Sequence, residues 1–421
     1  MNKEELKKFG YSNLHGHTDL DSNLRFYDAV ETVPQVLDFA SKNNYNAISF
    51  DGHESLASHM KAEQIYHDNP DKYGKFKLIL GNEIYLVHKD EMEKAEDNGD
   101  KFKFNHFLLT ALDKEGHKFL QKQSSLAWSH WHMYHGSERV PSYYEDIEKL
   151  MKDYKGHVVG SCACLAGNFA QNILNYKETG DKAYFQNAKK FVMWGIKVFG
   201  KDNFFMELMP SQNPQQITVN QYALKFSQKL GIGYIITTDA HYIDQSQREV
   251  HTALLRSRDQ SRDITAYDTA HLFTVDELFG YFNDDVLTGA FENIQSIVDR
   301  VEDYTFEHTP IIPKSRIPEF KKVSLKDFGL NNDTKYKNIK EFIDSDNKDN
   351  QYYIKLILDG IKMTKTLQQK IDDYKKTILE HKKENREYFR ELVRLIGICE
   401  DKFGSVLNAP DDSYEAQSVR L

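Results

Sequence analysis

The sequence predicts an α/β fold in which parallel strands close into a barrel, followed by a C-terminal helical extension. Short apolar runs alternate with amphipathic stretches through the first part of the chain, which is typical of strands joined by helices. So many of these units within roughly 250 residues favour a barrel over an open sheet. The chain also contains neither a dinucleotide-binding glycine fingerprint nor a P-loop, the motifs that would favour the open sheet.

The predicted strands are short apolar runs, and helical periodicity fills the segments between them. We expect strands at residues 46–50, 76–80 with a continuation toward 85, 106–111, 157–161, 204–208 and 234–238. Apolar residues between 219 and 230 recur at helical spacing, and Gly231 supplies a stop. Pro34 stands where the first turn of another helix tolerates a proline.

The bulk composition is that of a folded protein in a reducing compartment. Of the 421 residues, 40% are hydrophobic, and no apolar run is long enough to span a membrane, so we expect no membrane partner. The charged first residues give no secretory signal, and three cysteines make no disulfide framework. We therefore expect a cytoplasmic protein, in the host cytoplasm if a phage encodes it. The net charge of −9 argues against a broad nucleic-acid-coating surface but allows a local basic groove.

The composition changes after about residue 305, where three prolines precede a polar stretch rich in Asp, Asn and Lys. This change predicts a barrel at residues 1–318, a polar linker at 319–350 and a helical extension at 351–421. In the extension, one helical stripe runs from Leu367 to Ile378 and a second from Phe389 to Phe403. The two stripes predict a helical hairpin that packs on the barrel or on a partner.

Side chains that bind metals stand near the ends of the predicted strands. His15 and His17 alternate after the first apolar residues, so on an extended chain they point to the same side. Similar side chains recur at later strand ends, namely Asp51, His53, Glu83, His106, Cys164, Asp239 and His241. Taken singly, such a group is more often a hydrogen-bonded structural residue. Because imidazole, carboxylate and thiolate groups bind zinc and transition metals, and barrel rims hold active sites, their joint placement indicates one shared metal site.

The motifs that carry these residues occur in an order that has a known counterpart. They are Leu14-His15-Gly16-His17-Thr18, Gly52-His53-Glu54-Ser55, Gly81-Asn82-Glu83-Ile84-Tyr85, His106-Phe107-Leu108-Leu109, Cys162-Ala163-Cys164-Leu165-Ala166-Gly167 and Thr238-Asp239-Ala240-His241-Tyr242. In this order they resemble the PHP (polymerase and histidinol phosphatase) domain of bacterial DNA polymerase III alpha subunits. The resemblance extends from about residue 10 to about residue 318.

The resemblance implies a distorted (βα)7 TIM-like barrel with up to three divalent metal ions, zinc, manganese or iron, at its C-terminal mouth. Carried over residue by residue, the nine ligands fall on His15, His17, Asp28, His53, Glu83, His106, Cys164, Asp239 and His241. The segment before Asp28 is longer here than is common in the family, and Asp21 is its rival for that position. Where relatives read Thr-Asp-His, this chain reads Asp51-Gly52-His53, which leaves any supporting role of that acid open.

The chemistry implied is hydrolysis of a phosphate ester by a metal-bound water. We expect Asp239 and His241 to bridge or position the metals, and His106 or His53 either to bind metal or to give a proton to the leaving oxygen. In polymerase-linked members the resemblance implies a 3′–5′ exonuclease that acts on DNA, at a single-stranded 3′ end. Other members of the family lack several ligands and are inactive scaffolds, whereas here all nine positions hold competent residues.

Several further residues are weaker candidates. Arg25 and Arg139 could clamp a phosphate, and Trp131 could stack on a base. The surrounding segment 129–135 is predicted to be a loop, and its histidines favour packing or substrate contact over metal binding. The acids of Asp19-Leu20-Asp21 also indicate a loop. Cys162 has no partner pair for a zinc knuckle, so we expect it in the core.

Two alternative functions stay open. No apolar-flanked aspartate set follows residue 320, so we expect this chain to lack a polymerase palm and not to synthesise DNA alone. It could then be a non-catalytic scaffold that binds a separate polymerase subunit through its C-terminal helices. It could instead be a small-molecule phosphatase of the histidinol-phosphatase type. Metal analysis combined with a nuclease assay separates these readings from the exonuclease.

Overall fold

The computed structural model describes residues 1–258, 260, 264–306, 309, 316–328, 340–341 and 343–380, together with residues 394, 397, 398 and 401. The chain divides into two compact units, Met1–His308 and Thr309–Leu421. The first unit carries every residue of the candidate site. We describe each unit by itself.

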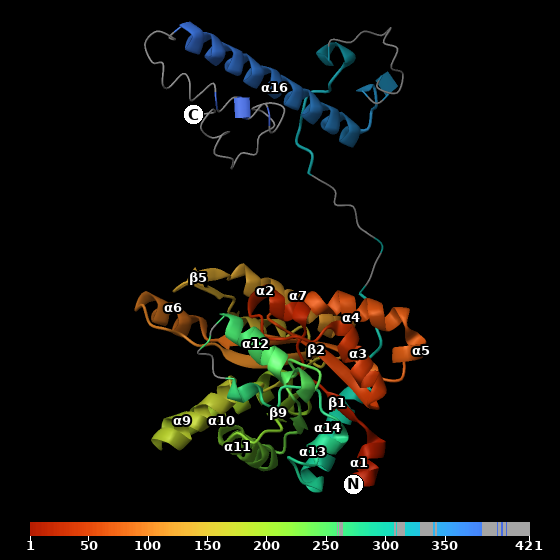
Figure 1. Cartoon of the computed structure of the whole chain (residues 1–421), viewed down its shortest axis with the longest axis vertical. Coiled ribbons are helices and arrows are strands. Elements are labelled where there is room, and N and C mark those ends of the chain that lie inside the picture. The colour runs from red at the N-terminus through yellow and green to blue at the C-terminus, as the bar shows by residue number, and fades with distance from the viewer. Residues whose placement is uncertain are drawn as a thin grey trace. The chain divides into compact units, whose positions relative to one another are not determined.

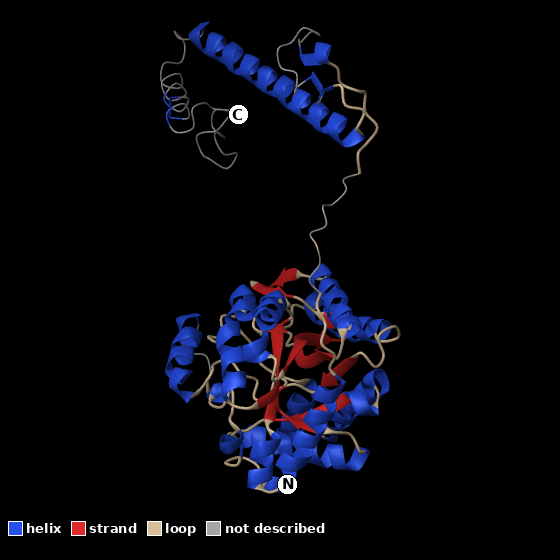
Figure 2. Ribbon diagram, turned by 90° about the vertical axis from the view of Figure 1, so that its right-hand side faces the viewer, coloured by secondary structure: helices blue, strands red, loops and turns tan. Residues whose placement is uncertain are grey.

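The first unit is built around one sheet whose strands follow the order β1-β2-β3-β4-β8-β9-β10, with β7 paired to the end of β3. The strands are β1 (Tyr11–Asn13), β2 (Tyr45–His53), β3 (Lys77–Val87), β4 (Asn105–Ala111), β7 (Ser142–Tyr143), β8 (Val158–Ser161), β9 (Phe204–Leu208) and β10 (Tyr234–Ile236). All the strands predicted from the sequence are present, and β1 and β7 are additional. The helices enclose this sheet in Figure 2.

The two edges of the sheet meet just beyond β1 and β10. Gly16 and Ala240 form a parallel bridge, and the His17 amide donates to the Ala240 carbonyl at 2.8 Å. Tyr11, on β1, donates its hydroxyl to the Ile236 carbonyl of β10 at 2.9 Å. The sheet is therefore a nearly closed barrel, which confirms the predicted fold class.

One strand departs from the parallel arrangement that the sequence predicts. β4 is antiparallel to both of its neighbours, β3 and β8, whereas β1-β2-β3 and β8-β9-β10 are parallel. The end of β3 pairs with the start of β4, Leu86 opposite Asn105, so the chain turns back at the same end of the sheet. The start of β4, with His106, therefore lies at the barrel mouth to which the other strands lead.

Helices cover the outside of the barrel (Figure 1). They are α1 (Lys3–Phe9), α2 (Asp19–Arg25), α3 (Val33–Lys42), α4 (Ala57–Asp68), α5 (Pro70–Tyr73), α6 (Lys89–Asp97), α7 (Lys114–Ser129), α8 (Tyr144–Leu150), α9 (Asn168–Thr179), α10 (Lys182–Phe199), α11 (Pro214–Leu230), α12 (Arg248–Arg258), α13 (Val275–Leu278) and α14 (Asp284–Arg300), with 3-10 turns at Lys201–Asn203, Gln245–Gln247 and Thr265–Tyr267. Pro34 lies in the first turn of α3, and Gly231 ends α11 in the left-handed conformation at φ 61°. Apolar side chains such as Phe50, Phe107 and Leu208 are fully buried between strands and helices.

Two segments expected to be loops have regular structure. Asp19-Leu20-Asp21 forms the first turn of the helix α2. Asp21 is buried there and accepts a hydrogen bond from the Ser58 amide of α4 at 3.1 Å. Segment 129–135 contains the first strand of a hairpin, β5 (His132–Tyr134) with β6 (Ser137–Arg139). Both segments are rich in polar side chains, so a search for regularly spaced apolar residues does not detect the helix or the strand.

The second unit contains a 3-10 turn (Leu325–Phe328) and the long helix α16 (Lys348–Glu380). Its buried cluster comprises Val323, Leu325, Ile343, Ile354 and Leu358. The first predicted helical stripe lies on α16, and the residues of the second lie outside the described part of the chain. No helix of the described residues is both long and apolar enough to cross a membrane. The three-part division of the chain remains a prediction.

Candidate metal centre

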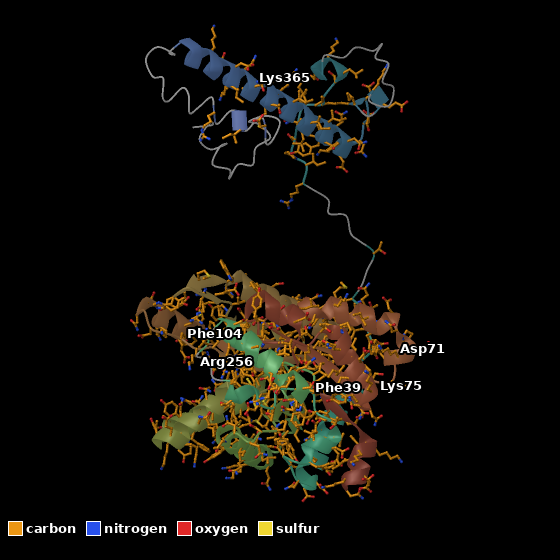
Figure 3. All side chains as sticks on the ribbon, viewed as in Figure 1. Phe39, Asp71, Lys75, Phe104, Arg256 and Lys365 are labelled. Atoms are coloured by element: carbon orange, nitrogen blue, oxygen red, sulfur yellow. The ribbon has the colours of Figure 1, made fainter. Side chains whose placement is uncertain are left out.

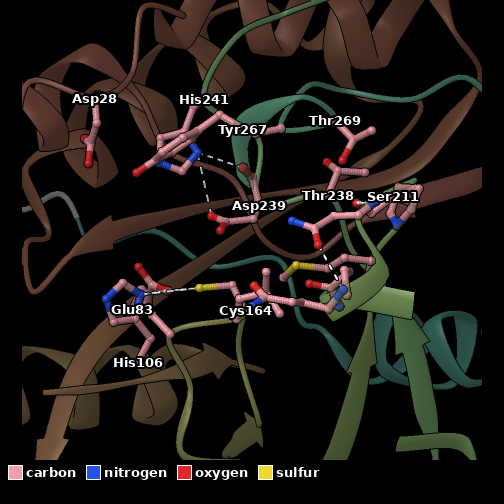
Figure 4. A pocket seen from close by; sticks show the side chains of 18 of the residues that line it. Asp28, Glu83, His106, Cys164, Ser211, Thr238, Asp239, His241, Tyr267 and Thr269 are labelled. Atoms are coloured by element: carbon pink, nitrogen blue, oxygen red, sulfur yellow. Dashed lines mark hydrogen bonds and ion pairs between the residues drawn. The ribbon is translucent and has the colours of Figure 1, made fainter. Parts of the chain in front are cut away.

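A pocket of about 480 Å³ opens at the mouth of the barrel. Figure 4 shows Glu83, His106 and Cys164 on one side of it, and Asp28, Asp239 and His241 on the other. Seven of the nine predicted ligand residues line this pocket, and the other two, His15 and His17, lie against the lining residues Glu83 and Asp239. They come from segments that are far apart in the sequence and lie next to each other because their strands are neighbours.

His15 and His17 lie on an extended segment directly after β1, not within a strand. Three hydrogen bonds fix this segment. The Asn13 side chain donates to the His15 carbonyl at 2.7 Å, the Gly16 amide donates to Asp51 at 3.1 Å, and the His17 amide donates to Ala240. Both imidazoles are buried and point into the barrel mouth.

Glu83 is the centre of the cluster. β2 and β3 are in register so that His53 lies opposite Glu83, and β4 brings His106 beside it. The two carboxylate oxygens lie 2.8 Å from Nδ1 of His53 and 2.7 Å from Nδ1 of His106. Burial alone would raise the pKa of Glu83, but His106 and the neighbouring imidazoles outweigh burial and hold the pKa well below its usual value.

Asp239 closes the cluster from the β10 side. Its Oδ1 lies 2.9 Å from Nε2 of His17 and 3.3 Å from Nε2 of His15. Its own carbonyl accepts from Nδ1 of His241 at 2.7 Å, which fixes the orientation of that ring. Asp239 has a φ of 47°, an unfavourable conformation for a residue with a side chain that persists where the surrounding structure requires it.

The geometry separates the two rival aspartates. Asp28 is buried, accepts from the Ser22 hydroxyl at 2.8 Å and lies 3.5 Å from Nε2 of His53. Burial would raise the pKa of Asp28, but the charge of His53 outweighs it and lowers that pKa. Asp21 is occupied elsewhere, by the Thr18 hydroxyl and the Ser58 amide. Only Asp28 lines the pocket.

Within the described residues, three groups of side chains could each hold a metal ion. They are His17, His53 and His241; His15, His17 and Glu83; and Glu83, His106 and Cys164, and in each group the candidate ligand atoms lie within 4.8 Å of one another. His17 and Glu83 are shared, so the three groups form one continuous cluster.

The residues present fit bound cations. Nδ1 of His17 is buried and makes no hydrogen bond within the described part of the chain. Sγ of Cys164 lies 3.5 Å from Nδ1 of His106 and 3.8 Å from Glu83, and burial raises the pKa of this thiol well above its usual value. A divalent cation would reverse that effect and favour the thiolate, because a coordinating thiol is deprotonated.

The part of the chain that carries most of the cluster matches a known protein family. Residues 13–211 match the family model of the PHP domain. These residues form a PHP domain. Seven of the nine candidate ligands lie within the match, and Asp239 and His241 follow the last strand of the same barrel, β10.

Proteins similar to this chain include DNA polymerases. The chain is 36% identical over 362 residues to the probable DNA polymerase YorL of Bacillus subtilis, and equally to a DNA-directed DNA polymerase of Bacillus phage SPbeta; this covers 82% of the chain and 27% of each relative. It is 25% identical to the DNA polymerase III subunit alpha of Borreliella burgdorferi, over 73% of the chain and 25% of that protein. The chain thus spans about a quarter of the length of these relatives.

Among solved structures, one described as a metal-dependent phosphoesterase from Bifidobacterium adolescentis covers 70% of the chain, with 12% identity and a TM-score of 0.38. This likeness is too low to support an inference. The fold assignment rests on the strand order and the barrel closure.

Two of the weaker sequence candidates, Arg139 and Trp131, do not line the pocket. Arg139 stands with its guanidinium 5.4 Å from the centre of the Phe104 ring, and Trp131 is half exposed and donates to Glu138 at 2.9 Å. Arg25 ends α2, and its side chain lies outside the described part of the structure. Cys162 is buried in the core.

Two buried acids support the site: Glu207, which the sequence analysis did not single out, and Asp51, whose role it left open. Glu207, on β9, is buried and accepts from His15 Nδ1 at 3.0 Å, from the Thr237 hydroxyl at 2.7 Å and from the Ser161 hydroxyl. In the sequence, Glu207 is the one acid in the otherwise apolar run 204–208, and this could have marked it as a buried acid with a role in the site. Asp51 accepts a hydrogen bond from the Gly16 amide. Its carboxylate lies directly over Gly81, and a side chain at position 81 would clash with it, because the added Cβ would lie 1.9 Å from the Asp51 oxygen.

Proposed function

We propose that this chain is a metal-dependent phosphoesterase that removes nucleotides from the single-stranded 3′ end of DNA, as a 3′–5′ exonuclease. The observation that carries the proposal is the continuous cluster of three candidate metal groups, five of whose seven residues line one pocket. The similarity to DNA polymerases supports DNA as the substrate. Such a role implies action in the cytoplasm, the host's if a phage encodes the chain.

The metal-binding role is proposed for all nine residues of the cluster, with up to three zinc, manganese or iron ions. When bound, such ions lower the pKa of a bound water and offset the negative charge of the phosphate. Glu207 holds His15 through Nδ1, which leaves Nε2 of that ring for a metal. The Asp239 carboxylate lies within 3.3 Å of both His15 and His17, so it would hold metal together with these imidazoles.

The proton-transfer role is proposed for His106, with His241 as a positioning group beside Asp239. Glu83 engages Nδ1 of His106, which leaves the other ring nitrogen for the leaving oxygen or for a metal. His106 is the most exposed imidazole of the cluster, with 23% of its side chain accessible, so a substrate can reach it.

The test combines metal analysis of the purified chain with incubation of 5′-labelled single-stranded DNA. We expect bound transition metal and stepwise shortening from the 3′ end, both lost in His15→Ala and Asp239→Ala. His88→Ala, which removes an exposed imidazole outside the pocket, is the matched control and should leave both unchanged.

Three results would overturn the proposal. Metal-free, inert protein that captures a polymerase subunit would indicate a scaffold. Hydrolysis of a phosphomonoester without any hydrolysis of DNA would indicate a small-molecule phosphatase. Shortening that persists in both alanine variants would assign the activity to a contaminant. A polymerase subunit bound through the C-terminal helices stays a separate proposal, and α16 exposes Tyr353 and Leu356 on its surface.

A further inference from the structure

A series of aromatic rings leads away from the metal-binding residues. Phe26 and Tyr85 line the pocket, with ring centres 5.3 Å from His53 and 5.0 Å from His106 respectively. Their own ring centres are 5.7 Å apart. Tyr85, itself buried, is followed at 6.3 Å by the half-buried Phe104, so the series of rings continues beyond the pocket.

The series ends in a group that combines aromatic and positive side chains. The Arg139 guanidinium, from the β5–β6 hairpin, lies over the Phe104 ring at 5.4 Å. Phe102 lies 5.7 Å from Phe104, and both rings are half-buried on Val87, Met92 and Tyr143. One side of each ring is therefore anchored by packing.

Lysines alternate with these rings in the sequence Lys101-Phe102-Lys103-Phe104. Lys101 and Lys103 are exposed, and no carboxylate of the described residues lies within ion-pair distance of either lysine or of Arg139. The nearby acid Glu96 is engaged by His132 at 2.8 Å. These three cations are thus available to a negatively charged ligand, on a chain whose net charge is −9.

We propose that this aromatic track, formed by Phe26, Tyr85, Phe104 and Arg139 and flanked by Lys101 and Lys103, binds the single-stranded DNA whose 3′ end enters the pocket. Bases stack on aromatic faces and on guanidinium planes, whereas lysines follow the phosphates; this combination is typical of single-strand binding. The inference rests on the proposed function, because it supplies the substrate path of that same site. In this proposal the Arg139 guanidinium stacks on a base instead of clamping a phosphate, and Trp131 takes no part in binding.

The test is binding of a fluorescein-labelled oligothymidylate of about 12 nucleotides to the full chain in EDTA, measured by anisotropy, so that no turnover occurs. Phe104→Leu keeps the packing on Met92 but removes the aromatic face, and should weaken binding by about fivefold or more. Lys101→Ala/Lys103→Ala should reduce the salt dependence, lowering the slope of log K against log salt by about 1.4. Thermal unfolding of each variant checks that the fold is intact.

Matched controls lie elsewhere on the same unit. Phe39→Leu makes the same change in another half-buried ring, and Lys61→Ala/Lys75→Ala removes two exposed lysines. Figure 3 shows Phe39 and Lys75 well apart from Phe104. Both controls should bind like the wild type. The track is overturned if Phe104→Leu binds as tightly as these controls and the salt slope of the lysine variant is unchanged.

The outcomes keep this inference distinct from the proposed function. Degradation of DNA by the wild type, with unaltered binding in the track variants, would reject the track alone. Binding that depends on the track, without degradation in the presence of metal, would reject the exonuclease and leave a single-strand binding surface.

Discussion

At the scale of residues, the candidate metal ligands depend on acids that do not line the pocket. Glu207 is the clearest case, because it sets which nitrogen of His15 points to the cluster while itself held by two hydroxyls and the Ala163 amide. Such supporting hydrogen bonds fix the tautomer and orientation of a metal-binding imidazole.

We predict that Glu207→Gln lowers the affinity for metal by about 10- to 100-fold, since the amide holds the imidazole less strongly than the carboxylate does. Competition with a chromophoric chelator measures this affinity. Glu292→Gln, on the exposed side of α14, is the control and should bind metal like the wild type. Equal affinities in both variants would contradict the supporting role of Glu207.

A second residue-scale prediction concerns a buried histidine pair outside the site. His59 and His117 lie 3.1 Å apart, and burial together with the charge of His117 lowers the pKa of His59 to about 3, whereas burial lowers that of His117 to about 4. Both rings are neutral in the fold. Below about pH 6.5 the unfolded chain binds protons that the folded chain does not. The free energy of unfolding therefore decreases as the pH is lowered, by up to about 1.4 kcal/mol per pH unit for each ring.

His117→Gln should therefore make the free energy of unfolding less steeply dependent on pH between about 6.5 and 4. Above that range the variant and the wild type should show parallel pH dependence. Urea unfolding at a series of pH values measures the difference. An identical slope in both proteins would show that the pair is charged in the folded state.

At the scale of elements, the closure of the barrel and the placement of the site share one side chain. Asn13, on β1, accepts from the Thr238 amide at 3.0 Å and donates to the His15 carbonyl at 2.7 Å. Asn13→Ala leaves both buried groups without that partner and should cost about 2–4 kcal/mol of unfolding free energy. Asn13→Asp keeps the acceptor for Thr238 but sets a second oxygen against the His15 carbonyl in a buried place, so it should also destabilise the fold. Urea unfolding compares them with Asn69→Ala, an exposed control, and equal stabilities would refute the role of Asn13.

The sequence predicts the central strands correctly because their apolar runs are long enough to stand out, as in 46–50 and 204–208. It misses β1, which has three residues of which Ser12 and Asn13 are polar. It cannot predict the direction of β4, because a run of apolar residues does not show whether a strand is parallel or antiparallel to its neighbours. The direction of β4 is set by its antiparallel pairing with β3.

The choice between Asp21 and Asp28 also needs three dimensions. Both acids follow His17 closely in the sequence, and only the contact of Asp21 with the Ser58 amide of α4 shows that Asp21 is used elsewhere. The supporting acids are hidden for a similar reason, since their partners are distant in the sequence. Most candidate ligands could be predicted because they stand at strand ends, whereas Asp28 came only from the resemblance to the PHP domain.

At the scale of the whole molecule, the pocket concentrates carboxylates, a thiol and imidazoles in a buried space of the first unit. Bound cations should therefore stabilise that unit, and EDTA should lower its unfolding midpoint by about 5–10 °C. Trp128, Trp131 and Trp194 all lie in this unit, so tryptophan fluorescence reports it alone. In Asp239→Ala the shift should be much smaller. A wild-type midpoint that EDTA leaves unchanged would contradict bound metal.

The closure of the sheet by Gly16 and Ala240 has a consequence for biosynthesis. The first strand can complete its hydrogen bonding only after the last strand has emerged from the ribosome. Until then His15 and His17 face an unfinished rim, and Asp239 and His241 have not yet been made. The nine proposed ligands exist together only after translation has passed His241, so loading of the proposed metal site would have to wait until then.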